Sequence, residues 1–133
     1  MHDEKDVRVV LADDENHVRL LMKRIVLGLG YTVVGEAADG QKALELYEKE
    51  QPDLLLLDIK MPIMNGDEVL EEIMKQHPEA CVIIMTSKSD SDSVKKCIKL
   101  GATNYILKSP LINEIRIRIK ESYTKFIQKR KTS

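Results

Sequence analysis

The stretch that decides the fold is Leu54-Leu55-Leu56-Leu57-Asp58-Ile59-Lys60-Met61-Pro62. Four consecutive leucines predict a short strand that is buried on both faces, as in the middle of a parallel sheet. The run ends on a carboxylate, and Pro62 prevents the chain from continuing as a regular strand or helix. Ligands of open α/β sheets bind at the carboxyl ends of the strands. Asp58 is therefore a candidate for chemistry, with the capping of a turn as the alternative.

The segments on both sides of this strand alternate in the same way. Apolar runs predict strands at residues 7–11, 31–37, 54–57, 81–85 and 103–107. Helical spacing of apolar residues predicts helices at 15–29, 41–50, 67–76, from about 89 to 100, and from beyond Pro110 to about Lys129. Alternation of this kind requires right-handed crossovers and a parallel sheet covered on both faces. We therefore expect an α/β fold, a doubly wound five-stranded parallel sheet in the flavodoxin-like order 2-1-3-4-5 with five helices.

One segment fits this pattern less well. The alternation from Ile115 to Ile119 has the period of a strand, but the surrounding spacing and length are helical. We interpret it as part of the last helix, which leaves Ile117 outside the buried stripe.

Length and composition indicate one globular domain. The chain has 133 residues, of which 43% are hydrophobic and 32% charged. We expect a single domain over residues 1–133, with its core at about 6–127 and a frayed tail at 128–133. No apolar run approaches the length that crosses a membrane, and the acidic, polar N-terminus is unlike a signal peptide. Cys81 and Cys97 lack metal-ligand spacing and are expected to be buried thiols, which favours a cytoplasmic protein.

Charge is distributed unevenly along the chain. From Lys108 onward, eight basic and two acidic residues give a charge of +6, whereas the 13 basic and 20 acidic residues before it give −7. The basic C-terminal helix carries no interleaved aromatic residues and no motif that reads bases. We interpret it as a solvated helix face and expect no direct contact with nucleic acid.

The predicted strand order brings several polar side chains to one edge of the sheet. Strands 1 and 3 are neighbours, with strands 4 and 5 beside them, and their carboxyl ends carry Asp13-Asp14, Asp58, Thr86 and Lys108. Three adjacent carboxylates repel one another unless a cation neutralises them. Oxygen ligands without His or Cys favour Mg²⁺, with Mn²⁺ as an alternative. Such a site prepares one carboxylate to attack a phosphoryl group.

At these residues the chain resembles bacterial response-regulator receiver domains, over about residues 6–127. The motifs that carry the resemblance are Asp13-Asp14, Asp58 with Met61-Pro62 and Asn65-Gly66, Thr86-Ser87, and Gly101-Ala102 through Tyr105 to Lys108.

The resemblance implies a role for each residue at the edge of the sheet. Asp58 would be the phosphoacceptor, receiving phosphate from a histidine kinase or phosphotransfer protein. Asp14, Asp58 and the backbone carbonyl of Lys60 would ligate Mg²⁺, and Asp13 would act through a bound water or as a second ligand.

The resemblance also implies an output surface. Thr86 would hydrogen-bond the phosphoryl group, Lys108 would pair with it, and Tyr105 would turn inward as Thr86 moves. The face formed by helix 4, strand 5 and helix 5 would then control a partner protein or self-dimerisation. Ser87 is the rival of Thr86, but strand alternation directs only one of them toward the site.

Other functions remain open at this point. The chain could be the receiver portion of a longer DNA-binding response regulator. A Mg²⁺-dependent phosphohydrolase with Asp58 as its nucleophile would need a second acid two residues later, where Lys60 stands. We therefore expect a phosphoacceptor that is not a turnover enzyme. Nucleotide or flavin binding would need a phosphate-binding loop after strand 1, and acidic residues stand there instead.

Near the site, the chain departs from the family pattern after Lys108, and two further lysines allow two interpretations. The family usually has Pro directly after the lysine, joined by a cis bond, but here Ser109 intervenes before Pro110. A cis bond to Ser109 would cost about 3–4 kcal/mol, and we expect strand 5 to bring Lys108 to the site regardless. Lys60 and Lys88 either tune the lifetime of the phosphate or are simply solvated.

Overall fold

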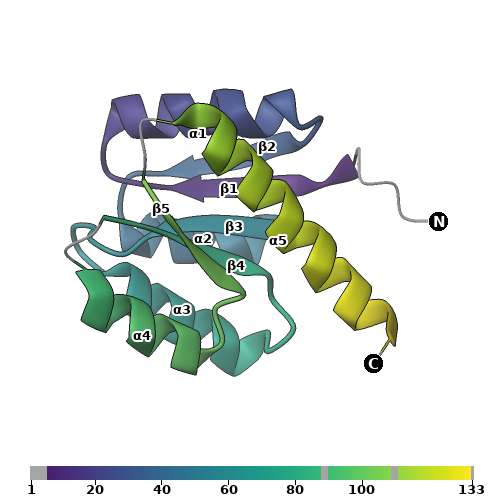
Figure 1. The fold of residues 1–133 in the computed structure, drawn as a ribbon. Coiled ribbons are helices and arrows are strands. Elements are labelled where there is room, and N and C mark those ends of the chain that lie inside the picture. Colours follow the sequence, from purple (N-terminus) through teal and green to yellow (C-terminus); the bar gives the residue numbers. More distant parts are fainter. Residues whose placement is uncertain (1–5, 88–89, 109–110, 133) are drawn as a thin grey trace.

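The computed structural model of the protein describes residues 6–87, 90–108 and 111–132. Its centre is a parallel sheet in the order β2-β1-β3-β4-β5, as the sequence predicts (Figure 1). The strands are β1 (Arg8–Ala12), β2 (Thr32–Ala37), β3 (Leu54–Asp58), β4 (Val82–Thr86) and β5 (Asn104–Leu107). The expectations for Lys88, Ser89, Ser109 and Pro110 lie outside the described residues.

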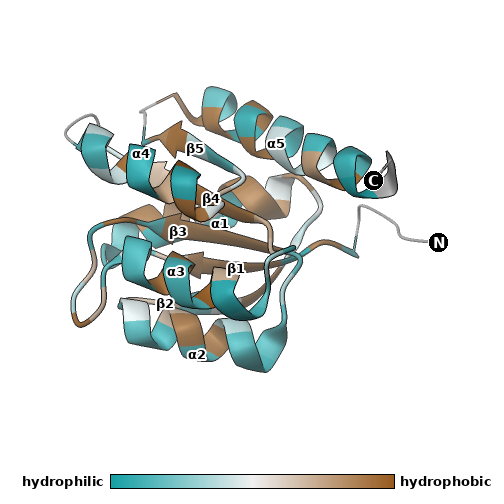
Figure 2. Ribbon diagram, turned by 90° about the horizontal axis from the view of Figure 1, so that it is seen from below, coloured by the Kyte–Doolittle hydropathy of each residue, from teal (hydrophilic) through white to brown (hydrophobic). Residues whose placement is uncertain are grey.

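Helices cover both faces of the sheet. They are α1 (Asn16–Gly28), α2 (Gly40–Glu50), α3 (Gly66–Gln76), α4 (Ser91–Leu100) and α5 (Ile112–Thr132). Buried residues of α1 and α5 pack on one face, and those of α2, α3 and α4 pack on the other. The apolar sides of the helices accordingly face the sheet, whereas their polar sides face outward (Figure 2). Among the described helices, none is long and apolar enough to cross a membrane.

The four leucines of β3 pack into the cores on both faces of the sheet. Leu55 and Leu57 belong to the core on the side of α2, α3 and α4, whereas Leu54 and Leu56 belong to the core on the side of α1 and α5. All four are fully buried. Successive side chains of a strand point to opposite faces, so a strand covered on both faces requires apolar residues at every position.

The last helix, α5, ends later than the sequence predicts. It continues to Thr132, past Lys129, and Ile117 within it is 55% exposed. Lysine and arginine are good helix formers, and their charge is favourable near a helix C-terminus. The basic residues after Lys129 therefore extend α5.

Two glycines hold the loop after β3 close to the rest of the structure. A Cβ at Gly66 would collide with the backbone carbonyl of Asp58, and a Cβ at Gly40 would collide with that of Met64. The N–H of Gly66 donates to the Ile59 carbonyl at 2.7 Å. The absence of side chains at these two points lets α2 and α3 begin directly against the loop that follows Asp58.

Gly66→Ala should destabilise the fold by about 2 kcal/mol or more, because the new methyl group meets rigid backbone at Asp58. Gly28→Ala is the matched control, since its Cβ would meet only Arg116 Nε at 3.9 Å. Alanine is the better helix former, so we expect the control to stabilise the protein by up to about 0.5 kcal/mol. Urea unfolding of both variants measures the difference, and equal effects would contradict the close approach at Gly66.

Candidate functional site

Three carboxylates meet at the carboxyl edge of the sheet. Asp13 and Asp14 follow β1 directly, and Asp58 is the last residue of the neighbouring β3. Ala12 pairs with Leu57, so the register places the residues that follow them side by side. One oxygen from each of the three carboxylates lies within 4.8 Å of the others. Asp13 is fully buried, Asp58 is 5% exposed and Asp14 is exposed, so the cluster opens to solvent on the side of Asp14.

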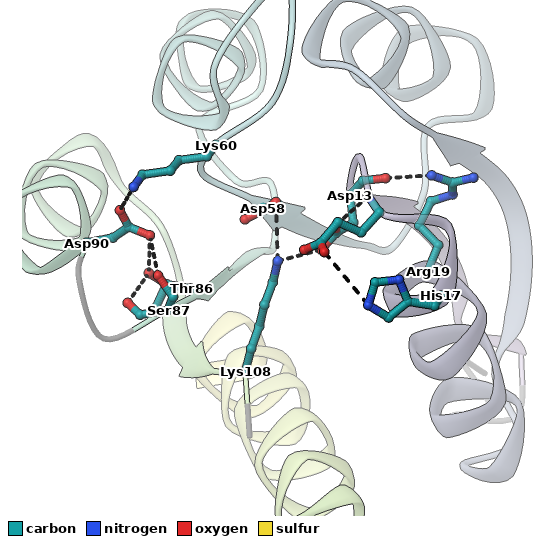
Figure 3. Close-up of polar contacts among 10 residues, drawn as sticks. Asp13, His17, Arg19, Asp58, Lys60, Thr86, Ser87, Asp90 and Lys108 are labelled. Atoms are coloured by element: carbon teal, nitrogen blue, oxygen red, sulfur yellow. Dashed lines mark hydrogen bonds and ion pairs between the residues drawn. The ribbon is translucent and has the colours of Figure 1, made fainter. Parts of the chain in front are cut away.

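Lys108 enters this cluster from β5. Its Nζ atom lies 2.8 Å from Asp13 Oδ2 and 3.3 Å from Asp58 Oδ2 (Figure 3). Its backbone N–H donates to the Thr86 carbonyl at 2.7 Å, which prolongs the pairing of β4 with β5 by one residue. The ammonium group thus lies in the site, as the sequence analysis expected.

The electrostatics of Asp58 follow from this crowding. Burial and the neighbouring charge of Asp13 raise the pKa of Asp58 to about 6, although Lys108 acts in the opposite direction. For Lys108, burial favours the neutral form, but the hydrogen bond to Asp13 and the charge of Asp58 outweigh it and raise its pKa. Three carboxyl groups face one ammonium group, and this set of oxygen ligands fits a divalent cation.

A network behind the acids fixes the backbone of Asp13. Asp13 Oδ1 accepts a hydrogen bond from the Glu15 N–H at 3.0 Å, and the Asp13 N–H donates to the Ala37 carbonyl at 3.0 Å. Arg19 donates to the Asp13 carbonyl at 2.7 Å (Figure 3). It also pairs with Glu36 at 3.6 Å. Sequence reasoning missed Arg19, although its position in the second turn of the helix after the acids could have indicated it.

Thr86 and Lys60 lie near Asp58, but their donors point elsewhere. The Thr86 hydroxyl donates to the Ser87 carbonyl at 3.1 Å and to Asp90 Oδ2 at 3.5 Å. The Lys60 ammonium pairs with Asp90 Oδ1 at 3.1 Å (Figure 3). Thr86 is buried and Ser87 is exposed, but both hydroxyls contact Asp90 Oδ2. Sequence reasoning considered Asp90 only as part of a helix start and missed this network.

Tyr105 lies outside the acidic cluster. It is 43% exposed and lines a groove of 580 Å³ between α4 and β5. The other lining residues are Thr86, Ser87, Ser91, Val94, Lys95, Ile98, Lys99 and Leu107. Thr86 is thus shared between this groove and the network around Asp90. His17 lies on the surface, 3.7 Å from Glu15.

Asp58→Asn should stabilise the metal-free protein at pH 7.5. The pKa of Asp58 in the folded state, about 6, exceeds its ordinary value of 3.8. The folded state therefore binds the proton more tightly, and stability falls as pH rises from about 4 to about 6. The neutral amide avoids this loss, so we expect a gain of about 1–2 kcal/mol at pH 7.5 after allowance for solvent screening.

Urea unfolding in the presence of EDTA at several pH values measures this effect. The gain should be lost near pH 3, below both the ordinary pKa of 3.8 and the folded-state pKa of about 6, where the Asp58 side chain is largely neutral in both states. A gain of the same size at about pH 3 and pH 7.5 would contradict the proposed charge repulsion.

Most of the chain is similar in sequence to known proteins. Residues 9–120 match the family model of the response regulator receiver domain. The chemotaxis protein CheY of Thermotoga maritima is 40% identical over 101 residues, which cover 76% of this chain and 84% of that protein. The transcriptional regulatory protein PdtaR of Mycobacterium tuberculosis is 34% identical over 90% of this chain, but the match covers only 58% of PdtaR.

A solved structure agrees with the geometry. A chain of the CheX-CheY-BeF3-Mg²⁺ complex from Borrelia burgdorferi superposes with a TM-score of 0.82 at 28% identity, covering 88% of this chain and 89% of that one. The acids at the ends of β1 and β3, the strand order and these matches lead to one assignment. The chain belongs to the family of response regulator receiver domains, which are phosphoacceptor signalling proteins rather than turnover enzymes.

Proposed function

We propose that the chain is a phosphorylation-activated switch in which Asp58 accepts a phosphoryl group from a histidine kinase or phosphotransfer protein. The observation that carries this proposal is the cluster of Asp13, Asp14 and Asp58, with carboxylate oxygens within 4.8 Å of one another beside Lys108. The complex of the Borrelia relative with beryllofluoride and Mg²⁺ supports it.

The residues of the site divide the chemistry among them. Asp14, Asp58 and the Lys60 carbonyl would hold Mg²⁺, with Asp13 acting through a water or as a further ligand. Bound Mg²⁺ would supply positive charge to the oxygens of the phosphoryl group in transit. Mn²⁺ would fit the same oxygen ligands.

The transfer itself needs an ionised Asp58. With a pKa of about 6, the carboxylate is mostly ionised at pH 7.5 and can attack phosphorus. A P–O bond forms on Asp58, the P–N bond to the donor histidine breaks, and the imidazole leaves with the electron pair. Lys108, 3.3 Å from Asp58, would balance the charge of the acyl phosphate.

The output would be a change at the groove between α4 and β5. A phosphoryl group on Asp58 would attract the Thr86 hydroxyl, which lies in the wall of the groove. Tyr105 would then turn inward into the space that Thr86 leaves. Ile98 and Leu107 make the groove apolar, so the face of α4, β5 and α5 could bind a partner protein or a second copy.

The second candidate is that the chain acts as the receiver portion of a longer DNA-binding response regulator. The match to PdtaR favours it, because the chain spans little more than half of that transcriptional regulatory protein. The chemistry at Asp58 would be the same in both cases.

Incubation with Mg²⁺ and acetyl phosphate should add one phosphoryl group to the chain, measured by intact-mass spectrometry. EDTA and Asp58→Asn should each abolish the addition. Asp67→Asn is the matched control, because Asp67 is also paired with a lysine, Lys96 at 2.9 Å, but lies outside the cluster. Modification that persists in Asp58→Asn, or sustained turnover of a phosphomonoester, would contradict the proposal.

Beryllofluoride with Mg²⁺ should shift the amide resonances of α4 and β5, and the Tyr105 side chain should become less exposed. The C-terminal half of α2, including the buried Tyr47, should keep its shifts, because only the start of this helix lies against the loop after Asp58. Two-dimensional NMR of the labelled protein measures both regions. Shifts confined to the loops that carry Asp13 and Asp58 would contradict an output through Tyr105.

A further inference from the structure

We propose that Asp90 is a positioning residue, which holds the Thr86 hydroxyl and the Lys60 ammonium away from Asp58 until a phosphoryl group competes for them. The proposal rests on the proposed function of Asp58 and adds a restraint that acts before phosphorylation. Asp90 touches neither Asp58 nor the other two acids in any contact among the described residues.

The side chain of Asp90 contacts donors from two other parts of the fold. Oδ1 lies 3.1 Å from the ammonium of Lys60, in the loop after β3. Oδ2 accepts from the Ser87 hydroxyl at 2.9 Å and lies 3.5 Å from the hydroxyl of Thr86, at the end of β4. Asp90 itself directly precedes α4 and is 7% exposed. A single carboxylate therefore links β3, β4 and the start of α4 (Figure 3).

A simple capping role does not account for these contacts. Aspartate at an N-cap usually accepts a hydrogen bond from a backbone N–H in the first turn of its helix. Within the described part of α4, the Asp90 side chain makes no such bond, although its backbone occupies the N-cap position. Its oxygens face the donors of Lys60, Ser87 and Thr86 instead. Burial raises the pKa of Asp90, but the hydrogen bonds and charge of Lys60 and Ser87 outweigh it and lower the pKa.

The contacts of Asp90 compete with those that a phosphoryl group on Asp58 would make. The Thr86 hydroxyl has one proton, which faces the Ser87 carbonyl at 3.1 Å and Asp90 Oδ2 at 3.5 Å, so donation to a phosphoryl group would end both contacts. Lys60 extends from the loop after Asp58 toward Asp90, whereas Lys108 reaches Asp58 from β5 (Figure 3). The two lysines thus serve different carboxylates before phosphorylation.

If the donors of Lys60 and Thr86 left Asp90, the position of α4 would be affected. Asp90 would be left as a buried carboxylate with fewer partners, which is unfavourable. The start of α4 would have to move toward solvent or find new donors, and Ser91 and Val94 of this helix line the groove beside Tyr105. Asp90 therefore couples the movement of these donors, from Asp90 to a phosphoryl group on Asp58, to the position of α4.

Asp90→Asn tests this restraint. Asparagine is as good an N-cap as aspartate, so the helix should persist, while the loss of charge weakens the hold on Lys60 and Thr86. With saturating Mg²⁺, we expect beryllofluoride to bind about tenfold more tightly than to the wild type, the size of one charge-assisted hydrogen bond. Asp67→Asn, which breaks the exposed pair with Lys96, should leave the affinity unchanged. If Asp90→Asn fails to fold, Asp90→Ser replaces it.

A double-mutant cycle separates positioning from a structural role. Lys60→Met alone should change the affinity for beryllofluoride by less than about threefold. In the wild type, Asp90 holds the Lys60 ammonium, so the bound beryllofluoride gains little from it. In the Asp90→Asn background Lys60 is released, and Lys60→Met should weaken binding by about tenfold. An unchanged affinity in Asp90→Asn, or equal effects of Lys60→Met in both backgrounds, would overturn the proposal.

Spectra without beryllofluoride distinguish failure of this proposal from failure of the proposed function. Asp90→Asn should move the Thr86 methyl resonance, and Lys60→Met should move it in the same direction, because both break the network. If beryllofluoride leaves the wild type unchanged, the proposed function of Asp58 is wrong, and these spectra alone decide the role of Asp90. A Thr86 resonance that both variants leave in place would overturn the restraint.

Discussion

The structure depends on repulsion between carboxylates that hydrophobic burial forces together. The apolar residues of β1 and β3 leave water only if the two strands lie side by side in the middle of the sheet. That register brings Asp13 and Asp58 to the same edge, where burial and mutual repulsion raise the pKa of Asp58 to about 6. The burial of several leucines outweighs this cost, since each contributes about 2 kcal/mol. The fold thereby maintains a site that attracts cations and favours their binding.

Two lysines pair with three buried aspartates around this site. Lys108 serves Asp13 and Asp58, and Lys60 serves Asp90. A phosphoryl group would add negative charge at Asp58 and leave the charge of Asp90 unchanged. The pairing of lysines with carboxylates that is favourable in the free protein would then be less favourable in the modified one. Thr86 lies between the two halves, because its hydroxyl contacts Asp90 and its residue lines the groove with Tyr105. A local change in charge can therefore reach a surface on the far side of β4.

Sequence patterns predicted the fold and the acidic cluster for the same reason, since both follow from where buried strands end. The strand order places Asp13, Asp14, Asp58 and Lys108 together without knowledge of any side-chain rotamer. Asp90 and Arg19 could not be found in this way. The role of Asp90 depends on Lys60, 30 positions earlier, and on the direction in which its carboxylate points. An aspartate before a helix is most simply interpreted as a cap, and local reasoning therefore gave the position but missed the contacts.

Lys60 also bears on why the site suits a signal and not turnover. Hydrolysis of an acyl phosphate on Asp58 is accelerated when a nearby group accepts a proton from the attacking water. The position two residues after Asp58, where an aspartyl-nucleophile phosphohydrolase would carry its second acid, holds an ammonium that can only donate. In the free protein this ammonium is held 3.1 Å from Asp90, on the side away from Lys108. The position of that second acid is thus occupied by a side chain that pairs with the buried Asp90. Under the proposed function, this is the pairing with which a phosphoryl group on Asp58 would have to compete.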